Sequence, residues 1–242
     1  MKLRTVLFTV AGAFAIASAN AGDKAVVVEE PADLGASVAT GYNTHYIFRG
    51  VNTGENQITA QIDYDLSDLP IAIGAWYGNP TTGGGVNPGH SDELDLYATV
   101  SQTFGSVEAW LGYTAYIYPE GGATSTNEIG VGVGTSVGLV DLALGAYYDF
   151  DIDGWYIEAT AGHSITLCDT ASLDLSAGIA YQNDYYSAGS DFNNVLLVAA
   201  IPIELSDSAT LSVYVAGTLS LDAINSFQDD EVFGGASLSV TF

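Results

Sequence analysis

Basic residues are nearly missing from this chain. Lys and Arg together number 4, against 29 Asp and Glu in 242 residues, so the formal net charge is -25 at pH 7. A nucleic-acid partner is excluded, because binding to phosphates needs a basic surface. Charged residues make up only 14% of the chain and hydrophobic residues 48%, which also excludes intrinsic disorder.

Cysteine and methionine are equally scarce, with one of each. A single cysteine, Cys168, excludes a disulfide framework and any zinc or iron–sulfur site built from cysteines. Low contents of Met, Lys, Arg and Glu are atypical of a helix-rich enzyme. No run of 18 apolar residues follows residue 21, so we expect no transmembrane helix. What remains is an all-β chain that is rich in Gly (28) and Tyr (15).

The first residues have the organisation of a secretory signal peptide. Two basic residues precede an apolar run from 6 to 17, and a small-residue cleavage site ends at Ala21. We therefore expect a cleaved signal peptide over 1–21, a periplasmic lead-in over 22–34 and one exported domain over 35–242.

Apolar and polar residues alternate at period two throughout the exported part, which is the pattern of strands with two different faces. The last segment alternates strictly and ends on Phe242. We expect about twelve antiparallel strands of roughly ten residues or more. They start near residues 36, 57, 70, 93, 107, 128, 139, 155, 171, 193, 209 and 232.

The connections between these segments alternate as well. Short turns lie on one side, and longer polar loops lie on the other at 79–92, 119–127, 183–192 and 222–231. Aromatic residues crowd the strand ends on the loop side, as in the girdle of a membrane barrel. A soluble β-sandwich would not sort its aromatic residues in this way. The sequence therefore predicts an all-β fold, a single antiparallel transmembrane β-barrel in the outer membrane.

The N-terminal third also resembles a known family. The stretch from Thr40 to Val51 (TGYNTHYIFRGV), the triplet at 62–64 (IDY) and the segment 73–77 (IGAWY) resemble the opening of the TorF-type porins. The resemblance implies an outer-membrane barrel whose substrate is poorly known. The strong acidity and the loss of Lys depart from a typical member of that family.

Positions that face the lumen follow from the alternation if the apolar face meets lipid. On the first strand, Arg49 shares the inward face with His45, whereas Tyr46 and Phe48 are expected outward. Two roles are open for Arg49: an ion pair with a lumen carboxylate, or a constriction residue that contacts permeant anions. The predicted pore-lining residues are Arg49, His45, Asp63, Asp65, Asp95, Glu108, Glu128, Asp141, Glu158 and Asp174.

A twelve-strand barrel leaves a bore on the order of 10 Å, which admits ions and small solutes. Lumen carboxylates concentrate cations, so we expect a cation-preferring porin whose partners are outer-membrane lipids and small solutes or cations. The oligomeric state is left open, and a high-salt adaptation would also explain the acidity. The alternative is a non-conducting structural or adhesive barrel with Ca²⁺-binding loops, plugged by inward Tyr97, Trp110, Tyr116, Tyr147 and Tyr214.

Residues 149–154 read DFDIDG and match the first half of an EF-hand loop. The second half is absent, because position twelve would be Thr160. One interpretation is a tight hairpin turn at an Asp-Gly pair. The other is a Ca²⁺ or Mg²⁺ site formed by Asp149, Asp151 and Asp153.

A hydrolytic centre is not expected. His163 and Ser164 are adjacent in the sequence, and adjacent strand residues point to opposite faces of a sheet. They cannot form a nucleophile–base pair, so the sequence predicts that the protein is not an enzyme.

Overall fold

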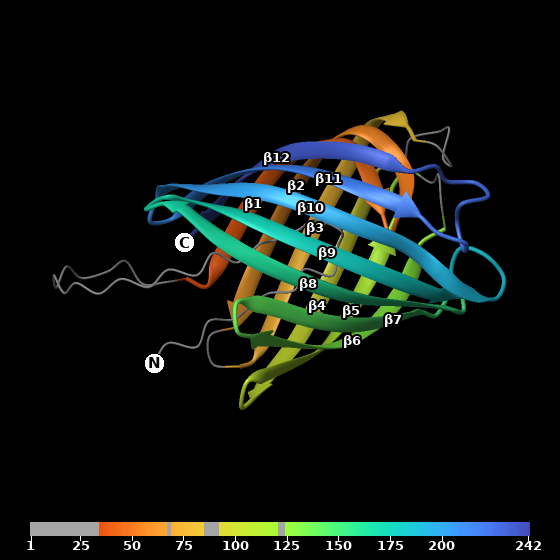
Figure 1. The fold of residues 1–242 in the computed structure, drawn as a ribbon, viewed down its shortest axis with the longest axis horizontal. Coiled ribbons are helices and arrows are strands. Elements are labelled where there is room, and N and C mark those ends of the chain that lie inside the picture. Colours follow the sequence, from red (N-terminus) through yellow and green to blue (C-terminus); the bar gives the residue numbers. More distant parts are fainter. Residues whose placement is uncertain (1–33, 67–68, 85–91, 121–123) are drawn as a thin grey trace, which may run out of the picture.

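Twelve antiparallel strands close into one barrel in the computed structural model, which describes residues 34–66, 69–84, 92–120 and 124–242 (Figure 1). The predicted signal peptide and residues 22–33 of the lead-in lie outside the described residues. In the described part, no helix is long and apolar enough to span a bilayer. The sequence-based prediction of an all-β barrel of about twelve strands is confirmed.

The strands follow one another around the barrel in chain order, and the last strand pairs with the first. Their bounds are β1 Ala36–Phe48, β2 Val51–Leu66, β3 Ile71–Gly83, β4 Glu93–Phe104, β5 Val107–Ile117, β6 Thr126–Val137, β7 Val140–Asp149, β8 Gly154–Cys168, β9 Ala171–Asn183, β10 Ser190–Ser206, β11 Ala209–Ser220 and β12 Glu231–Thr241.

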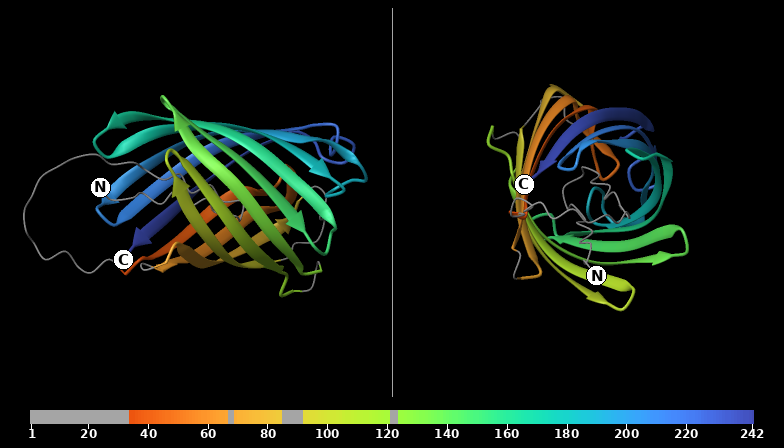
Figure 2. Two further views of the ribbon diagram at one scale, coloured as in Figure 1. Left: turned by 90° about the horizontal axis from the view of Figure 1, so that it is seen from below. Right: turned by 90° about the vertical axis from the view of Figure 1, so that its left-hand side faces the viewer.

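Closure places the start of β1 beside the end of β12, where Ser37 pairs with Thr241. Four turns at this end of the barrel have only two residues: 105–106, 138–139, 169–170 and 207–208. The opposite end carries longer connections, among them 184–189 and 221–230. We call the first end the turn side and the second the loop side; Figure 2 shows the barrel from two further directions.

The apolar residues of each strand point outward, as expected. Ile62, Leu144 and Val215 are each half or more exposed, at 53%, 50% and 54%. Their strand neighbours on the other face point into the lumen, where Asp63 bonds the hydroxyl of Tyr97. This distribution is the inverse of a water-soluble fold and is the one that a lipid environment stabilises.

One hairpin departs from the barrel wall. The strand β1 pairs with β12 only as far as Asn43, opposite Gly235, and beyond that point it pairs with β2 alone. The pairing of β1 with β2 also shifts by one residue between Tyr46 and Ile47, which marks a β-bulge. Residues 44–53, called here the hairpin tip, bend into the lumen on the loop side.

The position of the hairpin tip corrects the sequence-based face assignment. Tyr46 and Phe48 were expected to face lipid, but Tyr46 is buried against Trp76, and Phe48 packs against Tyr116 inside the barrel. Alternation predicts opposite faces only for a strand that stays in the wall. A hairpin inside the lumen has both faces covered.

The aromatic girdle needs a similar correction. Tyr42, Tyr113 and Trp155 point outward and are 43%, 47% and 42% exposed, as an interfacial girdle requires. Many other loop-side aromatics point inward instead and fill the lumen. These are Tyr46, Phe48, Trp76, Tyr116, Tyr147, Tyr156, Tyr185 and Tyr186.

Candidate functional site: the closed loop side of the lumen

Arg49 lies at the centre of the loop side. The sequence pattern placed Arg49 in the first strand, but Arg49 is the first residue of the two-residue turn between β1 and β2, with φ 49°. Its guanidinium nitrogens donate to both carboxylate oxygens of Glu128 on β6, at 2.5 and 2.8 Å. Both side chains are buried, 7% and 1% exposed. Of the two roles considered for Arg49, the structure places it in an ion pair with a lumen carboxylate.

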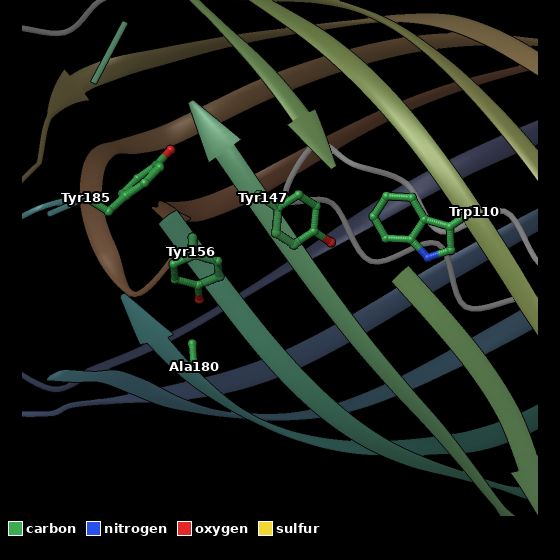
Figure 3. Packing of buried hydrophobic residues seen from close by; sticks show 5 residues of the cluster. All are labelled: Trp110, Tyr147, Tyr156, Ala180 and Tyr185. Carbon is green, nitrogen blue, oxygen red and sulfur yellow. The ribbon is translucent and has the colours of Figure 1, made fainter. Parts of the chain in front are cut away.

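Four aromatic rings surround the same guanidinium. The Cζ atom of Arg49 lies 4.7 Å from the ring centroids of Tyr147 and Tyr156, and 4.9 Å from those of Phe48 and Tyr185. Figure 3 shows Tyr147, Tyr156 and Tyr185 together inside the barrel. Ring faces attract a cation, and the attraction is stronger away from water.

This environment fixes the charge of Arg49. Burial is the largest single effect and lowers the pKa of this guanidinium, but the carboxylate of Glu128 and the neighbouring Tyr185 and Tyr116 together raise it by more, so the pKa of Arg49 is held well above its ordinary value. The hydroxyl of Tyr185 accepts a further hydrogen bond from the guanidinium at 2.6 Å. Arg49 is therefore always charged, and its ion pair with Glu128 holds the hairpin tip in the lumen.

Backbone contacts hold the tip against the opposite wall. Asn193 of β10 donates from its side-chain amide to the carbonyl of Arg49 at 2.7 Å, and Tyr186 donates from its hydroxyl to the carbonyl of Phe48 at 2.9 Å. Gly50 has φ 85°, and a Cβ atom there would lie 2.7 Å from Cγ of Asn194. Only glycine allows this close approach.

The loop between β9 and β10 supplies the other half of the closure. Gln182, next to the end of β9, is buried in the lumen, and its amide oxygen accepts from the backbone N–H groups of Tyr185 and Tyr186 at 2.8 and 2.7 Å. These bonds turn both tyrosines into the lumen. The tip thus meets an inward-folded loop as well as the barrel wall.

The predicted pore-lining acids all lie on strand faces that point inward, in two groups. On the loop side, Asp95 and Glu128 are each only 1% exposed, and Glu158 accepts from Tyr147 at 3.3 Å. On the turn side, Asp65 and Glu108 are half-buried and Asp141 is exposed, while Asp63 accepts from the hydroxyl of Tyr97 and Asp174 is buried beside Ser172. His45 belongs to the hairpin tip and is half-buried. Among the described residues, the inward acids near the turn side are thus more exposed than those near the loop side.

The three aspartates of the β7–β8 turn point to separate partners. Asp149 accepts from the N–H groups of Asp151 and Ile152 at 2.9 Å each, Asp151 accepts from Asn127, and Asp153 accepts from the hydroxyl of Tyr148 at 2.5 Å. Among the described residues, no three His, Cys, Asp or Glu side chains are grouped to hold a metal ion. These bonds support the turn interpretation, and divalent-ion binding at this turn stays a prediction.

The sequence analysis missed three residues of this region. Glu93 begins β4 and is buried on the lumen face, two residues before Asp95. Its alternation with Leu94 could have identified it. Tyr185 and Tyr186 lie in a loop, where no periodicity assigns a direction to a side chain.

His163 and Ser164 lie on opposite faces of β8, as expected. The ring Nδ1 of His163 lies 2.6 Å from the carbonyl of Leu139, and Ser164 pairs across the sheet with Asp174. They form no nucleophile–base pair.

Comparisons with known proteins agree on the fold. No protein-family model and no curated protein sequence matches the chain. Among solved structures, it is similar to the KdgM porin (TM-score 0.59, 8% identity, 85% of this chain and 99% of that one). It is also similar to LpxR from Salmonella typhimurium (0.56, 11%, 85% and 100%) and to an outer membrane channel from Pseudomonas putida F1 (0.52, 11%, 91% and 100%).

At these identities the similarity concerns the fold. Two of the three proteins are named a porin and a channel, and the name of the third states no activity. The chain has the architecture of outer-membrane barrels, while the resemblance to TorF-type porins stays a prediction.

Proposed function

We propose that the protein is a non-enzymatic outer-membrane channel for ions and small solutes, that it prefers cations, and that its hairpin tip closes the loop side. The charge of the lumen is the observation that carries this proposal. Arg49 is the only Lys or Arg in the described part of the chain, and Glu128 neutralises it. Several further carboxylates, among them Asp63, Asp95 and Asp174, lie on the same lumen faces, so the described part of the lumen carries an excess of acidic groups. Membership of the TorF-type porins is a further part of the proposal.

Cation preference follows from the distance between the wall and the pore axis. In a bore on the order of 10 Å, the axis lies within about one Debye length of the wall at physiological salt. Wall charge is therefore felt by every permeating ion, and a negative wall raises the local concentration of cations.

We expect a reversal potential in a KCl gradient to report roughly tenfold preference for K⁺ over Cl⁻ at neutral pH and low salt. The preference should fall at high ionic strength. It should vanish as the pH is lowered towards about 4, because carboxylates then become protonated. Anion preference at neutral pH would contradict the proposal.

The outer membrane is the compartment that suits a barrel with an apolar outer face. In this location the turn side faces the periplasm. We expect a bulky, membrane-impermeant maleimide to leave the exposed Cys168 of the turn side unmodified on intact cells. Permeabilised cells should react at Cys168. In a Cys168→Ser background, Ile152→Cys on the loop side should react on intact cells. The reverse pattern would contradict the orientation.

A second function is favoured by the tight packing of the loop side. A barrel whose lumen never opens would be a structural or adhesive protein, and the buried cluster of Trp110, Tyr147, Tyr156 and Tyr185 fits such a plug. Single-channel recording separates the two functions, because the channel must open at least transiently and the plugged barrel never conducts.

A further inference from the structure

Asp95 is a buried carboxyl group. It lies on the lumen face of β4 and is 1% exposed, and neither of its oxygens accepts a hydrogen bond from an N–H group or a hydroxyl group of the described residues. Burying an ionised carboxylate costs several kcal/mol unless a positive group or a set of donors compensates it. The described residues therefore do not supply the N–H or hydroxyl donors that an ionised Asp95 needs.

The nearest acidic group makes the deficit larger. Glu93 lies two residues earlier on the same face and is 5% exposed, and its carboxylate interacts directly with that of Asp95. One oxygen of Glu93 accepts from the hydroxyl of Tyr46 at 2.8 Å. The two carboxyl groups thus contact each other deep in the lumen, where they can share either a proton or a cation, and the hydroxyl of Tyr46 donates to the pair. Arg49 does not fill the gap, because both of its terminal nitrogens bond Glu128.

A second buried oxygen without a partner lies on the neighbouring strand. Thr114 of β5 is 1% exposed, and its hydroxyl has no hydrogen-bond partner among the described residues. The pairing of β4 with β5 places Asp95 opposite Tyr116 and Tyr97 opposite Thr114, so Thr114 is the diagonal neighbour of Asp95 on the lumen face.

We infer that a hard divalent cation of the Ca²⁺ type binds between Glu93 and Asp95, with the hydroxyl oxygens of Tyr46 and Thr114 as further ligands. All these groups offer oxygen, which hard cations prefer, and two positive charges balance two carboxylates. The site is separate from the β7–β8 turn. Tyr46 belongs to the hairpin tip, so the cation also helps to hold the tip in the lumen.

The site can be tested independently of conduction, on the full chain purified in detergent and treated with EDTA. Calorimetric titration with Ca²⁺ should show one more bound ion per wild-type chain than per Asp95→Asn chain. Glu93→Gln should lose the same ion or bind it at least about tenfold more weakly. Asp151→Asn is the matched control in the β7–β8 turn and should keep this ion.

A luminescent probe locates the ion without altering a ligand. Terbium bound at this site should be excited through Trp76, the cross-strand partner of Asp95, and Ca²⁺ should displace it. Trp76→Phe should then abolish most of the emission and Trp155→Phe, next to the β7–β8 turn, should not. Equal Ca²⁺ binding by wild type and Asp95→Asn, or emission lost only in Trp155→Phe, would overturn the inference. Absence of any Ca²⁺ binding would also overturn it, and would favour a proton shared by the two carboxyl groups.

Discussion

Replacing Glu128 by Gln should destabilise the barrel by about 3–5 kcal/mol, the usual cost of leaving one charge of a buried ion pair without its partner. Arg49 cannot lose its proton, and its side chain is only 7% exposed. The aromatic rings around it replace only part of the lost attraction, since a cation–π contact contributes about 0.5–2 kcal/mol. Unfolding in urea of protein refolded into lipid vesicles measures the loss.

Replacing both partners should have a much smaller effect. The pair Arg49→Met and Glu128→Leu removes both charges and fills a similar volume, so we expect stability close to that of the wild type. Asp141→Asn is a control on the turn side, where the exposed carboxylate bonds Ser136, and it should cause no measurable change. If Glu128→Gln were also silent, the ion pair would not be what holds the tip in place.

Most of the wall of this barrel was predictable, because a strand between lipid and lumen must alternate. The starts of β1, β4, β5, β9 and β11 coincide with the sequence-based prediction. The inward direction of acids such as Asp63, Asp95 and Asp174 follows from the same periodicity. One-sided burial is a local property of the sequence, so one chain suffices to detect it.

The hairpin tip was not predictable for a physical reason. The second strand begins at Val51, six residues before the expected start near Gln57, because residues 51–55 lie in or next to the tip, where none of them is exposed. The turn uses Arg49 at positive φ, whereas sequence rules expect Asn, Asp or Gly at such a position. The contacts that compensate this conformation come from Glu128, Tyr185 and Asn193, which are far away in the sequence.

The groups that surround Arg49 could not be predicted either. A single inward cation among carboxylates predicts an ion pair, but it does not predict which carboxylate. Arg49 meets Glu128 because the tip enters the lumen to the depth at which Glu128 lies. Tyr185 reaches Arg49 because the backbone of the β9–β10 loop is hydrogen-bonded to Gln182. Local periodicity encodes neither of these two contacts.

Removing the hairpin tip should open the channel and raise its single-channel conductance several-fold. The tip fills the loop side together with the β9–β10 loop, so its removal widens the bore towards the value on the order of 10 Å set by twelve strands. Residues 47–53 can be replaced by Asn-Gly, a turn that joins Tyr46 to its partner Gly54 in register. The shortened protein also carries Glu128→Gln, because Glu128 would otherwise be a buried carboxylate that has lost its ion-pair partner Arg49.

The most direct test is therefore planar-bilayer recording of this shortened protein beside the wild type and a control in which Asn-Gly replaces residues 150–153 of the exposed β7–β8 turn. We predict brief openings for the wild type and the control, and a large, steady, cation-preferring conductance for the shortened hairpin. Equal conductance for all three proteins, or none from any of them, would contradict a channel closed by its β1–β2 hairpin.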